Sequence, residues 1–407
     1  MPSDAISPLL TLDGWELLSS LGPYREADSL KLNETLRKAG HSPELVAAAL
    51  TQARLRSKAE AKFGEFAHQM LFTQAGLEQA TRLSIAALHA QRFTTANITS
   101  VADLGCGLGA DSLAMASLDI AVTAVEMDEI TAACTTVNLM PFPHAKVICG
   151  KAEEADLSGI EGVWLDPARR TTNTSGTTRL FDPEAFSPPL SFVESLAERG
   201  LAVGVKMGPG IPHEAVPETA EAQWISINGD VVEAGLYFNQ LARPGIHRSA
   251  LVIGKHGSAE LTSAEKYEPL KQNAELGPVS NYLYEPDGAV IRAGLVADLA
   301  RSLGAHLLDE HIAYLSSEEA IDTPFARGYK VLEVKPFNVK ALKSWVKTNK
   351  IGVLDIKKRG ISVTPEELRR QLLTGSGKGP NKATLILTRI GEDRVAVVVE
   401  PLGAGEL

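Results

Sequence analysis

The stretch from Val101 to Glu126 constrains the fold of this chain more than any other part of it. It begins with a short apolar run that ends at Leu104, passes through three alternate glycines and an apolar helical segment, and closes with a second apolar run and a glutamate. Short apolar runs bounded by glycine are typical of buried parallel strands. The stretch therefore predicts a strand, a tight turn, a helix and a second strand, which is the repeating unit of a doubly wound α/β sheet.

Gly105, Gly107 and Gly109 occupy alternate positions in the turn after the first strand. Without Cβ atoms they permit a tight turn and let a ligand lie against bare backbone. Ligands of doubly wound sheets bind at the carboxyl ends of the strands, where Glu126 is placed to accept the hydroxyls of a ribose. Asp103 precedes the turn, and its carboxylate suits an ammonium group but repels the pyrophosphate that a G-x-G-x-x-G turn binds. The turn therefore predicts a nucleoside pocket, with a purely structural role of the glycines as the alternative.

The segment from Asp103 to Gly109 reads Asp-x-Gly-x-Gly-x-Gly, which resembles the first motif of class I S-adenosylmethionine-dependent methyltransferases. The resemblance implies a Rossmann-like sheet and S-adenosylmethionine as the cofactor. The residues that it places at the cofactor are Asp103, Gly105, Cys106, Gly107, Gly109, Glu126 and Met127, the last beside the adenine. Lys151 stands where many of these enzymes have an aspartate that meets the adenine amino group, so the Ala152 amide or the Glu153 carboxylate would take over that contact.

Phe72 and Thr73 precede the helical segment that leads into the first strand. They resemble the Phe-Thr or Phe-Ser turn that closes over the cofactor in many class I methyltransferases acting on nucleic acid, with the trimethylguanosine synthase group as the nearest comparison. The resemblance adds Thr73 and Gln79 to the predicted cofactor contacts. The alternative is that Phe72 belongs to the core and Thr73 caps the next helix.

Asp166 and Pro167 follow the predicted fourth strand and resemble the fourth methyltransferase motif, where substrate and methyl group meet. In enzymes that methylate base amines an aromatic ring follows and stacks on the flipped base. The usual motif of these enzymes is Asn/Asp/Ser-Pro-Pro followed by an aromatic residue. Here Ala168 and Arg169 occupy the last two positions of that motif, so the aromatic ring is missing. Uridine-C5 methyltransferases with Asp-Pro-Pro-Arg also need a later nucleophilic cysteine, and no cysteine follows Cys149, which argues against that covalent route.

Direct methyl transfer is the mechanism that these motifs imply. It requires the acceptor atom to lie in line with the carbon–sulfur bond in a site shielded from water. Asp166, next to Pro167, would orient the acceptor or take its proton. Arg169 and Arg170 would hold a phosphate, with a solvated loop as the alternative. Lys206 ends the predicted fifth strand and either faces the substrate or only solvates the loop. The predicted catalytic residues are Asp166, Pro167, Arg169 and Lys206, and Arg170 is predicted to contact RNA.

The C-terminal part of the chain is basic although the whole chain carries a net charge of -10. The segment Arg327–Arg394 contains 16 Lys and Arg against 6 Asp and Glu, whereas the remainder contains 24 against 44. A basic segment on an acidic body indicates a polyanionic partner. From residue 330 the chain alternates predicted strands and helices and resembles the RNA-binding THUMP-type domain, so the whole resembles bacterial class I methyltransferases with a C-terminal THUMP-like domain. The residues predicted to contact RNA there are Trp345, Lys357, Lys358 and Arg359.

A chain of 407 residues exceeds what one core usually fills, so two or three domains are expected. The polar stretch Gly254–Gly277 is typical of a linker. The predicted division comprises a helical N-terminal region (1–92), a methyltransferase domain (93–255), a linker and connecting segment (256–329) and a THUMP-like domain (330–407). The strands predicted to complete the methyltransferase sheet include Gly235–Asn239 and Ala250–Ile253, expected as an antiparallel pair. The fold class is therefore α/β, with a small α+β domain at the C-terminus.

Hydrophobic residues make up 44% of the chain and charged residues 22%, as in soluble globular proteins. No apolar run approaches the length of a bilayer span, and the N-terminus lacks a basic-then-apolar signal pattern. Three cysteines make a disulfide framework improbable and fit a reducing cytoplasm. No Cys/His spacing indicates a metal site.

The first hypothesis is a cytoplasmic enzyme that methylates rRNA or tRNA, with the basic tail binding structured RNA. The second is a methyltransferase acting on a small molecule or a protein, in which the tail is a packing or dimerisation module. The third is a cofactor- and RNA-binding protein without catalysis, because the aromatic residue usual after the Asp-Pro pair is missing. The sequence does not specify the RNA, the nucleotide or the methylated atom.

Overall fold

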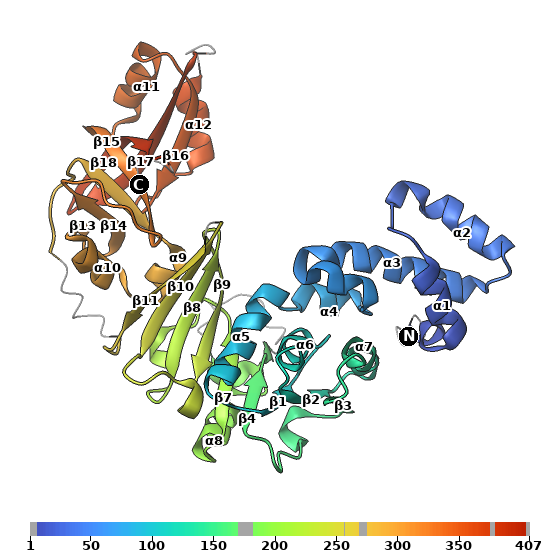
Figure 1. Cartoon of the computed structure of the whole chain (residues 1–407). Helices are drawn as coiled ribbons and strands as arrows, with labels where there is room; N and C mark the ends of the chain where they lie inside the picture. Colours follow the sequence, from blue (N-terminus) through green and yellow to red (C-terminus); the bar gives the residue numbers. More distant parts are fainter. Residues whose placement is uncertain (1–5, 170–181, 256, 268–274, 375–378, 404–407) are drawn as a thin grey trace. The chain divides into compact units, whose positions relative to one another are not determined.

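The structure is a computed structural model that describes residues 6–169, 182–255, 257–267, 275–374 and 379–403. The chain forms two compact units. The first comprises Met1–Met207, Pro217–Ala220 and Leu236–Ala242, and the second comprises Gly208–Val216, Glu221–Gly235 and Arg243–Leu407. Figure 1 shows the helices and strands of both units and labels most of them. No helix among the described residues is both long and apolar enough to span a bilayer.

Helices form the N-terminal part of the first unit, as the sequence predicts. Ser42 caps the longest of them, its Oγ accepting a hydrogen bond from the Leu45 amide at 3.2 Å, and Pro43 occupies the first helical position. The helices are α1 (Leu12–Ser20), α2 (Ser29–Lys38), α3 (Pro43–Phe63), α4 (Gln74–Gln79) and α5 (Leu83–Thr95). Short 3₁₀ turns lie at Ser7–Leu10, Glu26–Asp28 and Gly64–Gln69.

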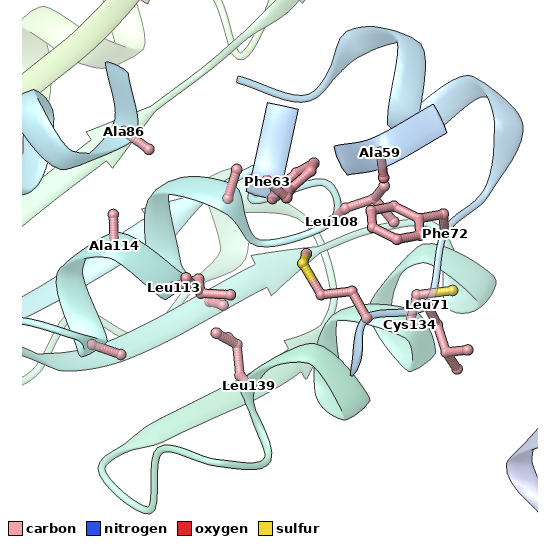
Figure 2. Packing of buried hydrophobic residues seen from close by; sticks show 14 of the residues in the cluster. Ala59, Phe63, Leu71, Phe72, Ala86, Leu108, Leu113, Ala114, Cys134 and Leu139 are labelled. Atoms are coloured by element: carbon pink, nitrogen blue, oxygen red, sulfur yellow. The ribbon is translucent and has the colours of Figure 1, made fainter. Parts of the chain in front are cut away.

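One hydrophobic core joins α3 to the sheet of the first unit. Phe63 at the end of α3 packs on Phe72, with their ring centroids 5.5 Å apart, and both belong to the cluster that contains Leu108 of the glycine turn (Figure 2). All three side chains are at most 2% exposed. The helical region therefore shares a core with the segment that carries the glycine turn.

Five parallel strands form the sheet of the first unit in the order β3-β2-β1-β4-β7. They are β1 (Ser100–Leu104), β2 (Ala121–Glu126), β3 (Ala145–Cys149), β4 (Gly162–Leu165) and β7 (Ala202–Met207), joined by α6 (Ala110–Ala116), α7 (Glu129–Leu139) and α8 (Leu190–Glu198). Two short strands, β5 (Ala168–Arg169) and β6 (Phe186–Ser187), pair antiparallel after β4. Short 3₁₀ turns lie at Ala152–Glu154, Pro183–Ala185, His213–Ala215 and Asn239–Leu241. The strand order reverses after β1, and this confirms the predicted Rossmann-like sheet.

Four further strands continue this sheet, whose full order is β11-β10-β8-β9-β7-β4-β1-β2-β3. They are β8 (Glu221–Ile227), β9 (Asp230–Tyr237), β10 (Arg248–Gly254) and β11 (Gly257–Ser263). The antiparallel pair predicted between Gly235–Asn239 and Ala250–Ile253 is wrong, because β10 pairs parallel with β8 and antiparallel with β11. Asn228 and Gly229 both have positive φ, as a two-residue hairpin turn requires, and this turn makes β8 the neighbour of β9.

A second sheet, in the order β13-β14-β12-β15-β18-β17-β16, belongs to the second unit. Its strands are β12 (Tyr282–Pro286), β13 (His306–Asp309), β14 (Ile312–Ser317), β15 (Ala326–Pro336), β16 (Ile351–Lys358), β17 (Asn381–Ile390) and β18 (Asp393–Pro401). The helices of this part are α9 (Gly288–Arg292), α10 (Val296–Leu303), α11 (Val339–Thr348) and α12 (Pro365–Leu373). This confirms the predicted α+β module at the C-terminus.

Residues 256–329, predicted to form a linker and connecting segment, contain regular secondary structure in their described part. This part contains β11, β12, β13, β14, α9 and α10, and β12 pairs with both β14 and β15. Apolar side chains at Leu283, Tyr284 and Tyr314 are fully buried, so this segment helps to form the core of the second sheet. The remaining domain boundaries stay predictions.

Candidate active site

The three glycines of the turn after β1 all have positive φ, at 85° for Gly105, 55° for Gly107 and 79° for Gly109. At Gly105 and Gly107 an added Cβ would meet no atom within 4 Å, so the backbone conformation alone requires glycine there. At Gly109 a Cβ would also lie 2.8 Å from the Thr135 side chain. Thr135 fixes the turn further by donating a hydrogen bond to the Gly107 carbonyl at 2.5 Å. The conformation of the turn is thus fixed, and its three glycines leave bare backbone against which a ligand can lie.

Glu126 ends β2 with its carboxylate held against the glycine turn. One oxygen accepts a hydrogen bond from the Gly107 amide at 3.0 Å, and the other accepts one from the Asp128 amide at 2.9 Å. Each carboxylate oxygen has a second lone pair available. Glu126 is therefore oriented by the backbone and still able to accept the hydroxyls of a ribose.

A cavity of about 810 Å³ opens beside this turn, within the range of small-molecule sites. Eleven of the predicted site residues line it: Gln79, Asp103, Gly105, Cys106, Gly107, Glu126, Met127, Ala152, Glu153, Asp166 and Lys206. Gly109, Thr73 and Pro167 do not line it. The Met127 side chain is 68% exposed, which leaves an apolar surface free at the rim.

Asp103 lies on β1 at the base of the cavity and is 1% exposed. It accepts a hydrogen bond from Ser112 Oγ at 2.5 Å. Burial, together with the nearby Asp111 carboxylate, raises the pKa of Asp103 above its usual range, and the Ser112 hydrogen bond only partly opposes this. A cation placed against Asp103 would favour its ionised form.

A buried histidine–aspartate pair borders the same cavity, and the sequence analysis missed it. Asp111 Oδ1 lies 2.7 Å from His89 Nδ1, and the His89 ring stacks on Trp164 with centroids 4.1 Å apart. Burial alone would raise the pKa of Asp111, but the hydrogen bond and charge of His89, together with the Lys206 charge and a hydrogen bond from Thr81, lower that pKa. The sequence contained a signal for this pair, because His89 lies on the apolar stripe of α5 and Asp111 on a fully buried helix.

Asp166 and Lys206 meet at the carboxyl ends of the neighbouring strands β4 and β7. Lys206 Nζ contacts Asp166 Oδ2 directly and donates a hydrogen bond to Thr81 Oγ1 at 3.1 Å. The side chains of Lys206 and Asp166 are 19% and 33% exposed. Of the two alternatives for Lys206, the geometry favours a position facing the cavity over a solvated loop. Thr81 is a further member of this group that the sequence analysis did not identify.

The segment that leads into α4 has the structure predicted by the second alternative, in which Phe72 is a core residue and Thr73 caps the helix. Phe72 is fully buried, and Thr73 caps α4 by accepting a hydrogen bond from the Gly76 amide at 3.0 Å. Thr73 and Gln79 also line a second cavity, of about 690 Å³, which borders Gly107 and Glu126. Contact of Thr73 with a cofactor stays a prediction.

Side chains from distant parts of the chain hold α4 at the cavity. Lys62 Nζ donates hydrogen bonds to the carbonyls of Leu77, Glu78 and Ala80 at 2.7–2.8 Å, near the end of α4. The amide side chains of Gln52 and Asn138 each bond both backbone groups of one residue, Phe72 and Leu71 respectively, just before α4. α4 therefore has a fixed place at the cavity rim.

The residues predicted to hold a phosphate or to contact RNA differ in their surroundings. Arg169 belongs to β5, and Arg170 lies outside the described residues. Lys357 forms an ion pair with Glu285 at 2.6 Å, and the Arg359 guanidinium lies 5.6 Å from the centre of the Tyr314 ring. Trp345 packs partly buried on the core beneath α11, whereas Lys358 is exposed.

A stripe of lysines on α11 is a stronger candidate surface, and the sequence analysis missed it. Lys340, Lys343 and Lys347 follow the i, i+3, i+7 spacing that places residues on one helical face, and Lys350 follows the helix. All four are exposed, and none pairs with a described carboxylate. This lysine stripe (Lys340, Lys343, Lys347 and Lys350) presents four positive charges to solvent.

Within the described ranges, no group of three or more His, Cys, Asp or Glu side chains is arranged to hold a metal ion. The three cysteines are free thiols, and Cys106 alone lines the cavity.

Comparisons with known proteins agree with this geometry. A family model described as "THUMP domain-like" matches residues 326–401, and a domain of unknown function matches residues 3–59. An "uncharacterized S-adenosylmethionine-dependent methyltransferase" of Mycobacterium tuberculosis, from each of two strains, is 31% identical over 345 residues, covering 83% of this chain and 91% of the relative. A solved structure from Porphyromonas gingivalis W83, named "putative methyltransferase", shares the fold with a TM-score of 0.71 at 19% identity, over 94% of this chain and all of that one. The chain therefore belongs to the S-adenosylmethionine-dependent methyltransferases and ends in a THUMP-like domain.

Proposed function

We propose that this methyltransferase transfers the methyl group of S-adenosylmethionine to RNA, in a reducing cytoplasm. The observation that carries the cofactor part is the acidic cavity around the glycine turn. Its lining holds five carboxylates against two lysines: Asp103, Asp111, Glu126, Glu153 and Asp166 against Lys151 and Lys206. Such a cavity favours a cationic ligand and disfavours the pyrophosphate of a dinucleotide. S-adenosylmethionine carries a sulfonium and an ammonium group, and these positive charges are complementary to the acidic lining of the cavity.

Different residues of the cavity would contact different parts of the cofactor. Glu126 would accept the ribose hydroxyls, and Asp103 would pair with the methionine ammonium group. Met127, Ala152 and Glu153 line the cavity and would contact the adenine. Bound S-adenosylmethionine supplies an electrophilic methyl group on a sulfonium. Asp166 and Lys206 face the same cavity from the ends of β4 and β7, where they would hold the acceptor.

We predict that replacing Lys62 by Met weakens S-adenosylmethionine binding about tenfold, since three carbonyls near the end of α4 lose their donor and the helix loosens at the cavity rim. Isothermal titration calorimetry measures the affinity. Lys58→Met is the matched control, because Lys58 is an exposed lysine on the same helix. Equal affinities of the two variants would contradict a positioning role for Lys62.

We predict that cofactor binding releases a proton from Asp103. In the free protein its raised pKa keeps part of the Asp103 population protonated near neutral pH. The ammonium group of the ligand favours the carboxylate, so affinity should increase as the pH rises towards the pKa of Asp103 in the free protein and then level off. Calorimetry in two buffers of different ionisation enthalpy measures the release, and Asp103→Asn should abolish it. Identical heats in both buffers would contradict the assignment.

The RNA part of the proposal is supported by the THUMP-like match at residues 326–401, by the basic composition of Arg327–Arg394 and by the lysine stripe on α11. Phosphate contacts by lysine dominate the affinity of proteins for RNA and make it depend on salt. Mass spectrometry of nucleosides from cells with and without this protein tests the proposal. Loss of one methylated nucleoside in the deletion strain is expected, and an unchanged nucleoside profile would favour a small molecule or a protein as the substrate.

We predict that replacing Lys340, Lys343 and Lys347 together by Ala weakens RNA binding at least tenfold. The slope of log affinity against log salt should fall by about two to three, because about 0.7 to 0.9 counterions are released per phosphate contact. Filter binding over a series of salt concentrations gives both values. The control replaces Lys31, Lys38 and Lys58, which are equally exposed lysines of the N-terminal helices. The same loss in the control would attribute the effect to net charge instead of the stripe.

A further inference from the structure

Asp166 and Lys206 place a hydrogen-bond acceptor and a donor side by side at one point of the cavity. Lys206 Nζ contacts Asp166 Oδ2 directly, and Thr81 Oγ1 accepts a further hydrogen bond from the same nitrogen at 3.1 Å. Both side chains remain partly exposed and line the cavity. Because the two groups touch, a single ligand atom can lie within hydrogen-bond reach of both. The pair is complementary to an atom that donates and accepts at once, as a hydroxyl oxygen does.

The described part of the cavity lining provides no aromatic ring on which a base could stack. Enzymes that act on a base extrude it from the helix and hold it between aromatic or apolar side chains. Arg169 occupies the position of such a ring in the sequence, after Asp166, Pro167 and Ala168, and Ala168 lines the cavity. A ribose hydroxyl lies on the outside of the nucleic acid backbone and is reached without extruding the base.

Resting on the proposed function, we infer that the methyl acceptor is a ribose 2′-oxygen of RNA, held between Asp166 and Lys206. The hydroxyl hydrogen is donated to Asp166, and one oxygen lone pair accepts a hydrogen bond from Lys206. The second lone pair is thereby directed at the methyl carbon. As the new oxygen–carbon bond forms, the carbon–sulfur bond breaks and its electron pair returns to sulfur, which leaves a neutral thioether. The oxygen becomes acidic as this bond forms, so its proton passes to the Asp166 carboxylate and then to water.

Other acceptors match the pair less well. An exocyclic base amine can donate to Asp166, but its nitrogen lone pair is delocalised into the ring, so Lys206 would gain no acceptor from it. The N1 and O6 edge of guanine meets both groups, but a guanine in this cavity would lack a described aromatic ring to stack on. Base methylation is therefore the outcome that would count against the inference.

Alkaline hydrolysis of methylated RNA distinguishes these acceptors. Total RNA from cells lacking this gene is incubated with the full-length protein and methyl-labelled S-adenosylmethionine, and the labelled RNA is then digested with alkali. A 2′-O-methyl group blocks cleavage at its own phosphodiester, so we expect the label in alkali-resistant dinucleotides. Label in mononucleotides would overturn the inference and leave the proposed function standing. No label in RNA, from protein shown to bind the cofactor, would overturn the proposed function and this inference with it.

Two variants test the role of Lys206 in the same assay. Lys206→Met removes the donor and should lower kcat for label transfer at least a hundredfold, and Lys206→Arg should recover part of that loss because it restores a cationic donor. Calorimetry with S-adenosylmethionine reports on folding, and both variants should retain cofactor affinity within about threefold. Wild-type transfer by Lys206→Met would show that Lys206 does not hold the acceptor.

Discussion

Replacing Asp166 by Ala should lower methyl transfer by about 10²–10⁴-fold, the range typical of a lost general acid–base group. Asp166 lines the cavity and contacts Lys206 directly, at the ends of β4 and β7. Its removal takes away the group that orients the acceptor and receives its proton. Transfer from labelled S-adenosylmethionine to total RNA measures the effect.

The matched control for this variant is Asp322→Ala, at an exposed aspartate of the second unit that does not line the cavity. Asp166→Asn serves as a second variant, because it preserves the size of the side chain but not its basicity. Both Asp166 variants should still bind the cofactor. Wild-type transfer by either of them would remove Asp166 from the mechanism.

Replacing Glu126 by Ala should weaken S-adenosylmethionine binding about a hundredfold. Two hydrogen bonds from ribose hydroxyls to a carboxylate contribute about 1.5 kcal/mol each, and their loss corresponds to this factor. The Gly107 amide also loses the acceptor that holds the glycine turn, at 3.0 Å. Calorimetry measures the affinity, and Glu129→Ala, at an exposed glutamate three residues further along, is the control. A change of less than about threefold in Glu126→Ala would contradict the ribose assignment.

The parts of the site that could be predicted from the sequence depend on local pattern. Three glycines at alternate positions after an apolar run specify a turn, and Glu126 follows from the strand that comes next. The proximity of Asp166 and Lys206 could be predicted because parallel strands present their carboxyl ends at one edge of a sheet. These features involve neighbours in the sequence or a regular sheet, and both leave a visible pattern.

The features that were missed depend on contacts between residues far apart in the sequence. Lys62 bonds carbonyls at the end of α4 that lie 15 to 18 residues further along the sequence. Asn138 bonds Leu71, from which it is separated by 67 residues. Nothing in the local sequence of Lys62 or Asn138 distinguishes it from an ordinary helical residue. The His89–Asp111 pair left a weaker trace, as polar residues on buried helical faces, which becomes interpretable only once a partner is known.

The errors in the fold have a similar origin. The Asn228–Gly229 turn is a strong hairpin signal, and giving it more weight would have paired β8 with β9 instead of β9 with β10. The polar composition of the segment after Gly254 suggested a linker, although the alternating polar residues of β11 suit a strand paired along one edge. Composition alone does not distinguish a connecting segment from a strand that is polar on its exposed face.

Titration of the purified full-length chain with S-adenosylmethionine tests most directly whether the acidic glycine-turn cavity holds this cofactor. We predict one binding site per chain with micromolar affinity, strongly weakened in Glu126→Ala, and no binding of a nicotinamide dinucleotide under the same conditions. Binding of the dinucleotide in place of S-adenosylmethionine would contradict the assignment of the acidic glycine-turn cavity. Equal binding of S-adenosylmethionine by wild type and Glu126→Ala would show that the cofactor is held elsewhere.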